Sequence, residues 1–112
     1  MSDCLFCKII SGDIPSQCVY QDDKVYVFND IDPQAPTHFL VIPKVHIKSC
    51  NEINNENSLV VAHCFEVISK VTKDMGIKSY RVVSNCGEQA GQSVEHLHFH
   101  VLAGRDMTWP PG

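Results

Sequence analysis

Three histidines alternate with apolar residues near the end of the chain, in the segment His96-Leu97-His98-Phe99-His100. If this segment is a strand, alternate side chains lie on one face, about 6.6 Å apart. The three imidazoles would then be close enough to address one small ligand, while Leu97, Phe99 and Val101 enter the core. Imidazole has an unperturbed pKa of about 6.5 and can act as nucleophile, base or acid near neutral pH. The spacing therefore predicts a reactive or ligand-binding face.

The histidine run is also compatible with a solvated strand face and with a zinc site. Exposed strand faces usually mix Lys, Glu, Thr and Ser rather than repeat one residue type, which disfavours the solvated face. Neutral imidazole is a common zinc ligand, so the motif alone leaves the zinc site open. The preceding loop, with Asn85 and Gly91-Gln92-Ser93-Val94, supplies backbone N–H groups, an amide and a hydroxyl that suit phosphate oxygens. We therefore expect an anionic, phosphate-bearing ligand.

The elements that must position these residues are short strands around one long helix. Apolar residues recur at helical spacing between Glu56 and Met75, and Gly76 is typical of a helix C-terminus. The remaining expected elements are a short helical turn over 4–10, a hairpin of strands 18–21 and 24–29, a loop over 30–36, and strands over 37–42, 80–85 and 94–102. This order predicts an α+β fold with a mostly antiparallel sheet.

Composition predicts one domain over residues 1–112 and excludes several function classes. The chain is 44% hydrophobic with a formal charge of −4, and its Lys and Arg residues form no basic stripe, so nucleic-acid and anionic-membrane partners are not expected. No basic region followed by an apolar stretch begins the chain, so we expect a soluble, cytoplasmic or nuclear protein whose six cysteines are reduced thiols. A domain of this size buries about two-thirds of its unfolded surface, which makes dimerisation plausible.

The histidine run matches the pattern His-φ-His-φ-His-φ-φ over residues 96–102, where φ is apolar. It resembles the signature of the histidine triad (HIT) superfamily. Residues 32–44, 91–94 and the ending Trp109-Pro110-Pro111-Gly112 are similar to its nucleotide-binding (Hint) branch, the adenosine 5′-monophosphoramidases. The resemblance covers nearly the whole chain. It implies a HIT-like fold of about five antiparallel strands, one long helix and a short N-terminal helix.

The resemblance also implies an activity and its catalytic residues. The expected reaction is hydrolysis of purine nucleoside phosphoramidates and aminoacyl-adenylates, with His98 attacking the α-phosphorus to form a nucleotidyl-histidine intermediate. His100 and the backbone near Ser93 would stabilise charge on the phosphoryl oxygens, Ser93 would help to protonate a leaving amine, and His96 completes the catalytic set. No cofactor is required for this chemistry.

The same resemblance assigns the nucleotide contacts, with AMP or a nucleoside phosphoramidate as ligand. Asp30 would bind the ribose hydroxyls, since a carboxylate can accept two hydrogen bonds. The remaining contacts fall on Phe6, Ile9, Ile31, Asn85, Gly91, Gln92, Ser93, Val94, His98 and His100. Phe6 and Ile9 would be apolar walls around the purine, or equally plain core residues. Trp109 would approach the site of the neighbouring subunit in a homodimer, or else plug the surface of its own chain.

Cys4 and Cys7 form a C-x-x-C pair that some close Hint relatives lack. The pair resembles that of certain HIT proteins outside this branch, which bind zinc through these thiolates together with the histidines that correspond to His46 and His96. Two cysteines and two histidines would satisfy a closed tetrahedral structural site. The alternative is a pair of unligated cysteines on a helical turn. His38 and His63 have no assigned role.

Two further functions remain open from the sequence. One is a nucleotide-binding regulatory or interaction protein with little turnover. The second is a dinucleoside polyphosphate hydrolase of the same superfamily, which would use the same nucleophile. The Trp-Pro-Pro-Gly ending argues against the polyphosphate hydrolase.

Overall fold

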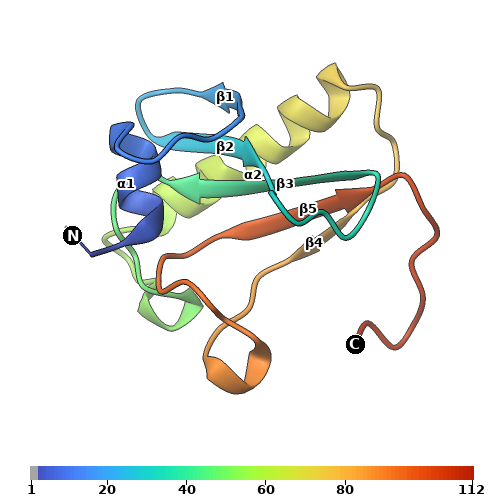
Figure 1. The fold of residues 1–112 in the computed structure, drawn as a ribbon. Helices are drawn as coiled ribbons and strands as arrows, with labels where there is room; N and C mark the ends of the chain where they lie inside the picture. The colour runs from blue at the N-terminus through green and yellow to red at the C-terminus, as the bar shows by residue number, and fades with distance from the viewer. Residues whose placement is uncertain (1–2) are drawn as a thin grey trace.

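The computed structural model describes residues 3–112 and contains one five-stranded antiparallel sheet (Figure 1). Its strands are β1 (Cys18–Gln21), β2 (Val25–Asn29), β3 (Thr37–Pro43), β4 (Arg81–Val83) and β5 (Phe99–Ala103). Their order in the sheet is β1-β2-β3-β5-β4. The chain-end strand β5 therefore lies in the interior of the sheet, paired with β3 on one side and β4 on the other. The predicted α+β class with an antiparallel sheet is confirmed.

A helix covers each face of this sheet. The long helix α2 (Ser58–Asp74) packs on the face that carries Val27, Phe99 and Val101, whereas the short helix α1 (Leu5–Ser11) packs on the opposite face. Alternate residues of β2 consequently enter different core clusters, as strand geometry requires. Two short 3₁₀ turns, η1 (Cys50–Glu52) and η2 (Glu88–Ala90), lie in the connections. No helix among residues 3–112 has the length and apolar character needed to cross a membrane.

Helix α2 ends where its glycine predicts. Gly76 adopts a left-handed φ of 74°, and the Ile77 N–H donates to the Thr72 carbonyl at 2.8 Å, which closes the last helical turn. The expected helix over 56–75 is thus confirmed. The observed helix starts two residues later, at Ser58, and ends one residue earlier, at Asp74.

Strand β5 begins at Phe99, so the predicted strand over 94–102 is wrong in its first half. The register pairs Val41 of β3 with Phe99, and its continuation would bring Pro43 opposite Leu97. Proline has no N–H to donate to a ladder. The Leu97 N–H instead donates to the Ile47 carbonyl at 2.6 Å. Residues 94–98, with two of the three histidines, therefore lie outside the sheet.

Strand β4 is also shorter than the predicted segment 80–85. After Val83 its backbone pairing with β5 stops, and the Ser84 hydroxyl donates to the His98 carbonyl at 2.9 Å. The Ser84 side chain thus bonds to the backbone at the point where a further backbone bond between β4 and β5 would lie, because β5 does not begin until Phe99.

Asp22 joins the β1–β2 turn to helix α2. One carboxylate oxygen accepts the N–H groups of Lys24 and Val25 at 2.8 and 2.9 Å, and the second oxygen accepts the Tyr20 hydroxyl at 3.0 Å and His63 Nε2 at 2.7 Å. Burial raises the pKa of Asp22, but these hydrogen bonds outweigh it and lower the pKa to about 2. The bond to Asp22, followed by that to Glu66, raises the pKa of His63.

The ion pair between Asp22 and His63 should contribute most to the free energy of unfolding at intermediate pH and less at acid and alkaline pH. Because the folded-state pKa of Asp22 is depressed, its contribution is present above the unfolded value near 4 and is lost as the pH falls towards about 2. Because the pKa of His63 is raised, its contribution is present below about 6.5 and is lost as the pH rises through the folded value. Replacing Asp22→Asn should lower the free energy of unfolding by about 1 kcal/mol between those limits and by less on either side.

Urea unfolding of wild type and Asp22→Asn across the pH range measures this difference. Asp23→Asn, at an exposed neighbouring carboxylate, is the matched control and should behave like wild type. A difference between wild type and Asp22→Asn that stays constant from acid to alkaline pH would contradict the ion pair.

Candidate functional site

His98 is buried, with only 5% of its surface exposed, and its ring orientation is fixed by one backbone carbonyl. Its Nδ1 lies 2.6 Å from the carbonyl oxygen of His96. A carbonyl can only accept, so Nδ1 carries the hydrogen and Nε2 keeps its lone pair. Burial lowers the pKa of His98, which leaves the ring neutral at pH 7. The arrangement leaves His98 with a lone pair on Nε2 that the hydrogen bond at Nδ1 does not occupy.

His100 receives a hydrogen bond from His38 on β3. The Gln34 N–H donates to His38 Nδ1 at 3.0 Å, so the ring hydrogen of neutral His38 is on Nε2. That nitrogen lies 2.9 Å from His100 Nδ1, which must accept and so leaves the hydrogen of His100 on Nε2. Burial, followed by the proximity of His98 and His38, lowers the pKa of His100 to about 4. His100 is thus a neutral hydrogen-bond donor at Nε2.

Asp30 and His38 complete this group of side chains. One Asp30 oxygen lies 3.4 Å from His38 Nε2 and 3.9 Å from His100 Nδ1, and the second oxygen accepts the Asp32 N–H at 2.8 Å. The ring centroids of His98 and His100 are 5.1 Å apart. Asp30, His38, His98 and His100 therefore form one connected array, which we call the imidazole array.

His38 had no role in the sequence interpretation. Strand register brings it here, because Leu40 pairs with His100 and His38 with Leu102, so His38 and His100 are diagonal neighbours on one face of the sheet. The strand that carries His38 was predictable from its composition, but the pairing of β3 with β5 was not.

The ring of His96 has no exposed surface, and its hydrogen-bond partners lie outside the imidazole array. Its Nε2–H donates to the Pro43 carbonyl at 2.9 Å, and its Nδ1 lies 3.3 Å from Cys4 Sγ and 3.2 Å from His46 Nδ1. Burial lowers the pKa of His96 to about 4. Of the three histidines in the run, His98 and His100 therefore lie together, and His96 belongs to a second cluster.

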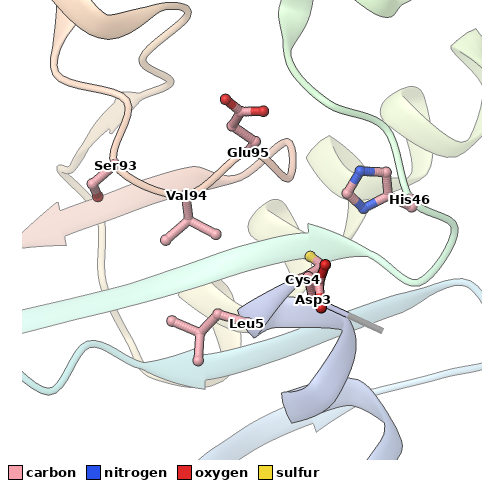
Figure 2. Close-up of a pocket in the computed structure, with 7 residues that line it drawn as sticks. All are labelled: Asp3, Cys4, Leu5, His46, Ser93, Val94 and Glu95. Carbon is pink, nitrogen blue, oxygen red and sulfur yellow. The ribbon is translucent and has the colours of Figure 1, made fainter. Parts of the chain in front are cut away.

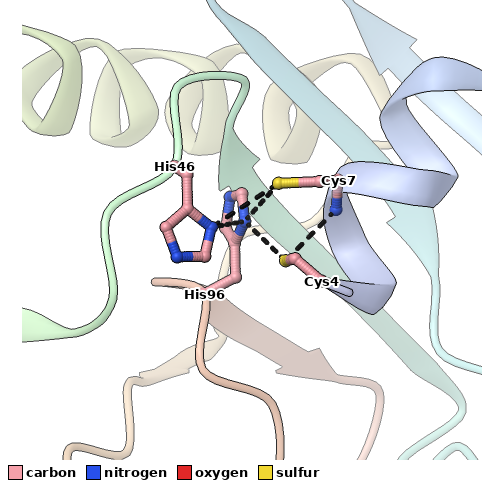
Figure 3. Close-up of side chains that lie close together, drawn as sticks. All are labelled: Cys4, Cys7, His46 and His96. Atoms are coloured by element: carbon pink, nitrogen blue, oxygen red, sulfur yellow. Dashed lines mark hydrogen bonds between the residues drawn. The ribbon is translucent and has the colours of Figure 1, made fainter. Parts of the chain in front are cut away.

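The second cluster contains Cys4, Cys7, His46 and His96, whose four donor atoms all lie within 4.8 Å of one another (Figure 3). We call it the Cys₂His₂ cluster. Cys7 Sγ is 3.5 Å from His46 Nδ1 and 3.6 Å from His96 Nδ1. In a tetrahedral zinc site with bonds of about 2.0 to 2.3 Å, ligand atoms lie roughly 3.3 to 3.8 Å apart. The residues present therefore fit a four-coordinate zinc ion.

Local structure explains how the cluster assembles. Cys4 caps the start of α1, where its Sγ accepts the Cys7 N–H at 3.3 Å, so both thiols lie within one helical turn. His46 follows β3, and His96 precedes β5. The bond from His96 Nε2 to the Pro43 carbonyl leaves Nδ1 free to bind a metal, an arrangement common for metal-binding histidines.

The loop before the histidine run is held in shape by Gln92. Its side-chain oxygen accepts the Gly87 N–H at 2.9 Å, and its amide nitrogen donates to the carbonyls of Lys48 and Val94 at 2.9 and 3.1 Å. The side chain of Gln92 thus shapes the loop through its own hydrogen bonds. Gly91 has a left-handed φ of 90° and lies beside Asn85, whose Nδ2 would be 3.7 Å from an added Cβ.

Ser93 and Val94 line a cavity of about 400 Å³ between this loop and the start of α1. Figure 2 shows the side chains of Val94 and Leu5 facing each other across it. The remaining lining residues are Asp3, Cys4, His46 and Glu95. The cavity thus connects the predicted phosphate-binding loop with the Cys₂His₂ cluster.

The predicted apolar contacts divide into buried and exposed residues. Phe6 and Ile9 lie in the core cluster under α1, and the ring of Phe6 meets His98 edge-on with centroids 5.1 Å apart. Ile31 and Trp109 are instead exposed, by 99% and 82%. Phe6 therefore contacts the imidazole array directly, whereas Ile31 and Trp109 lie on the surface of the chain.

Comparisons with known proteins identify the family of the chain. The family model for the scavenger mRNA decapping enzyme C-terminal binding region matches residues 3–109. A 14 kDa zinc-binding protein of Zea mays is 45% identical over 99% of this chain and 89% of its own length. A HIT-like protein of Synechococcus elongatus is 42% identical over 98% of this chain and 97% of its own.

Solved structures show the same fold. A HIT family hydrolase from Legionella pneumophila superposes with a TM-score of 0.95 and 46% identity, covering 98% of this chain and all of that one. A histidine triad protein from Clostridium difficile gives a TM-score of 0.93 and 46% identity over 96% of both chains. With the fold, the histidine run and nearly the full length matched, the chain belongs to the histidine triad (HIT) superfamily and is similar to its hydrolases.

Proposed function

We propose that this protein hydrolyses the phosphorus–nitrogen bond of purine nucleoside phosphoramidates, and the mixed anhydride of aminoacyl-adenylates, through a nucleotidyl intermediate on His98. The observation that carries this proposal is the fixed tautomer of His98, whose Nδ1–H is bound to the His96 carbonyl. A neutral imidazole with a bare Nε2 can attack phosphorus without first losing a proton.

In the first step, the lone pair on His98 Nε2 forms a bond to the α-phosphorus and the bond to the leaving amine breaks. The departing amine takes a proton from the Ser93 hydroxyl, whereas the carboxylate of an aminoacyl-adenylate leaves without one. In the second step, water attacks the same phosphorus, the P–N bond to His98 breaks, and the nucleoside monophosphate leaves. The proton lost by the water returns to Ser93 where the leaving group was an amine. Splitting the displacement into two steps is the advantage of a covalent nucleophile.

The neighbouring groups stabilise the phosphoryl oxygens. His100 offers its Nε2–H because His38 occupies its Nδ1, and a preorganised donor in a water-poor site stabilises developing negative charge. The Ser93 N–H and the amide of Asn85 are further donors in this proposal, whereas the Gly91 N–H is already bonded to the Glu88 carbonyl at 3.0 Å. These groups need no change of protonation state to act.

For the nucleoside, we assign the ribose hydroxyls to Asp30 and the purine to the apolar surface near Phe6, Ile9 and Ile31. Asp30 is partly exposed, with 18% of its side chain accessible, and each oxygen retains lone pairs beyond its present bonds. AMP, as the product of the reaction, should bind at the same place.

We propose that the Cys₂His₂ cluster holds one zinc ion. The donor set is two thiolates and two imidazoles from the protein, so no coordination position is left open for a substrate. When bound, the ion supplies a cross-link between α1 and the segments around His46 and His96, and the chemistry at phosphorus is left to the imidazole array. A relative in Zea mays is named for zinc binding.

We also propose a homodimer that uses the β4 edge of the sheet. β4 is a terminal strand of the sheet with half-buried valines, and α2 exposes 47% of Phe65, whose ring contacts Phe99 of the adjacent strand β5. Pairing of two such edges would cover backbone groups that an isolated edge leaves open. It would also bring Trp109 of one chain towards the site of its partner.

The substrate assignment is tested by turnover of an adenosine phosphoramidate, an aminoacyl-adenylate and a dinucleoside polyphosphate, with wild type and His98→Ala compared. We expect the first two to be hydrolysed, and His98→Ala to lose at least about 10⁴-fold in kcat because the nucleophile is gone. The variant should remain folded and bind AMP. Preference for the polyphosphate would overturn the substrate class, and tight AMP binding without turnover would favour a regulatory protein.

His38→Ala serves as a second variant in the same assay. Without the hydrogen bond to Nδ1, His100 is free to adopt either tautomer, so we expect a roughly 10- to 100-fold loss of kcat with intact AMP binding. Wild-type kcat in His38→Ala would contradict the assigned orientation of His100.

The zinc proposal is tested by elemental analysis of the purified protein. Wild type should carry one zinc per chain, and Cys7→Ser should lose it because a serine hydroxyl is a poor zinc ligand. Cys18→Ser, at an exposed cysteine outside the cluster, is the control and should retain the metal. Equal metal content in Cys7→Ser and wild type would refute the ligand set.

Sedimentation equilibrium tests the dimer. Wild type should have the mass of two chains, and Phe65→Glu should shift towards one chain because it places a charge beside the β4 edge. Leu59→Glu changes a residue of α2 that is 84% exposed and belongs to the side of the helix that carries His63, so it should remain dimeric. If both variants have the wild-type mass, the dimer does not use this face.

A further inference from the structure

The carbonyl that orients His98 is not held by the sheet. Residues 94–98 precede β5. Within residues 3–112, this segment makes one backbone–backbone hydrogen bond with a distant part of the chain, from the Leu97 N–H to the Ile47 carbonyl. The peptide between His96 and Leu97 carries the carbonyl that accepts His98 Nδ1–H. Its position must therefore depend on what anchors His96 and Leu97.

The side chain of His96 anchors that peptide on one side, and the Leu97 side chain, buried in the core against α2, anchors it on the other. The ring is completely buried, with one nitrogen bonded to the Pro43 carbonyl and the second placed among the donor atoms of Cys4, Cys7 and His46. His46 directly precedes Ile47, which accepts the Leu97 N–H. The two segments thus cross at adjacent residues, joined by one hydrogen bond and by the Cys₂His₂ cluster.

A second contact links the cluster to His98. Phe6 lies between Cys4 and Cys7 on α1, and its ring meets the ring of His98 at 88° with centroids 5.1 Å apart. α1 is only seven residues long, too short to be stable without tertiary contacts. The two thiols therefore help to fix the aromatic wall against which His98 packs.

We propose that the Cys₂His₂ cluster, when metal is bound, positions the nucleophile: it fixes the His96 carbonyl and the Phe6 ring, and these two groups hold His98 with Nε2 bare and correctly placed. His96 is then a positioning residue that acts through His98. The expected loss of kcat rests on the proposed function, whereas the fixed orientation of the His98 ring does not.

Metal removal should therefore lower kcat far more than it weakens nucleotide binding. Outer-shell positioning groups are typically worth 10- to 100-fold in activity, so we expect a roughly 10- to 100-fold loss of kcat, with KM and AMP affinity changed less than about threefold. Nitrogen-15 NMR of the imidazoles should show His98 as a single Nδ1–H tautomer in the zinc-loaded protein and as a mixture of tautomers in the stripped protein. Adding zinc back should restore both readouts.

The experiment compares zinc-loaded wild type, chelated wild type and Cys7→Ser, with Cys18→Ser as the matched control that keeps zinc, kcat and the single tautomer. If stripped wild type does not keep its fold, Cys7→Ser at a temperature where it is folded makes the same comparison. Unchanged kcat and an unchanged His98 tautomer, in stripped wild type or in Cys7→Ser, would overturn the proposal and leave the cluster as a tether alone. If zinc-loaded wild type hydrolyses no phosphoramidate, the proposed function fails, and the tautomer measurement still decides the positioning role.

Discussion

The hydrogen bond from His98 Nδ1 to the His96 carbonyl, 2.6 Å long, is the constraint on which the site depends. Either nitrogen of a neutral imidazole can carry the hydrogen until a partner distinguishes them, and a carbonyl does so because it can only accept. Burial keeps the ring neutral. A side chain that would otherwise be an acid, a base or a metal ligand is thereby left with one bare nitrogen.

The far end of the imidazole array is fixed in the same manner. The Gln34 N–H can only donate, so it sets the tautomer of His38, and His38 sets that of His100. Two backbone groups that do not titrate thus determine which ring nitrogen keeps its lone pair and which ring N–H is able to donate. The direction of each hydrogen bond follows from the backbone, and the expected division of labour between His98 and His100 follows from those directions.

Much of the fold was predictable from local patterns. Alternation placed Leu97, Phe99 and Val101 in the core against α2, and Gly76 marked the end of that helix, as the structure confirms. The start of β5 was not predictable, because it depends on Pro43 of a strand far away in the sequence that pairs with it. For the same reason, no local pattern revealed His38, whose place in the site comes from the register of β3 on β5.

The four residues expected from family resemblance to bind zinc do converge, and His96, which the resemblance assigns both to this cluster and to the catalytic set, lies with the two cysteines. The most direct test of the account is to stop a single turnover of an adenosine phosphoramidate by wild type with a non-acidic denaturant. The position of any covalent adduct on the chain is then mapped by mass spectrometry. We predict one adenylyl group, carried by His98. The account is contradicted if the adenylyl group is found on another side chain, or if turnover occurs and no adduct accumulates when the second, hydrolytic step is slowed.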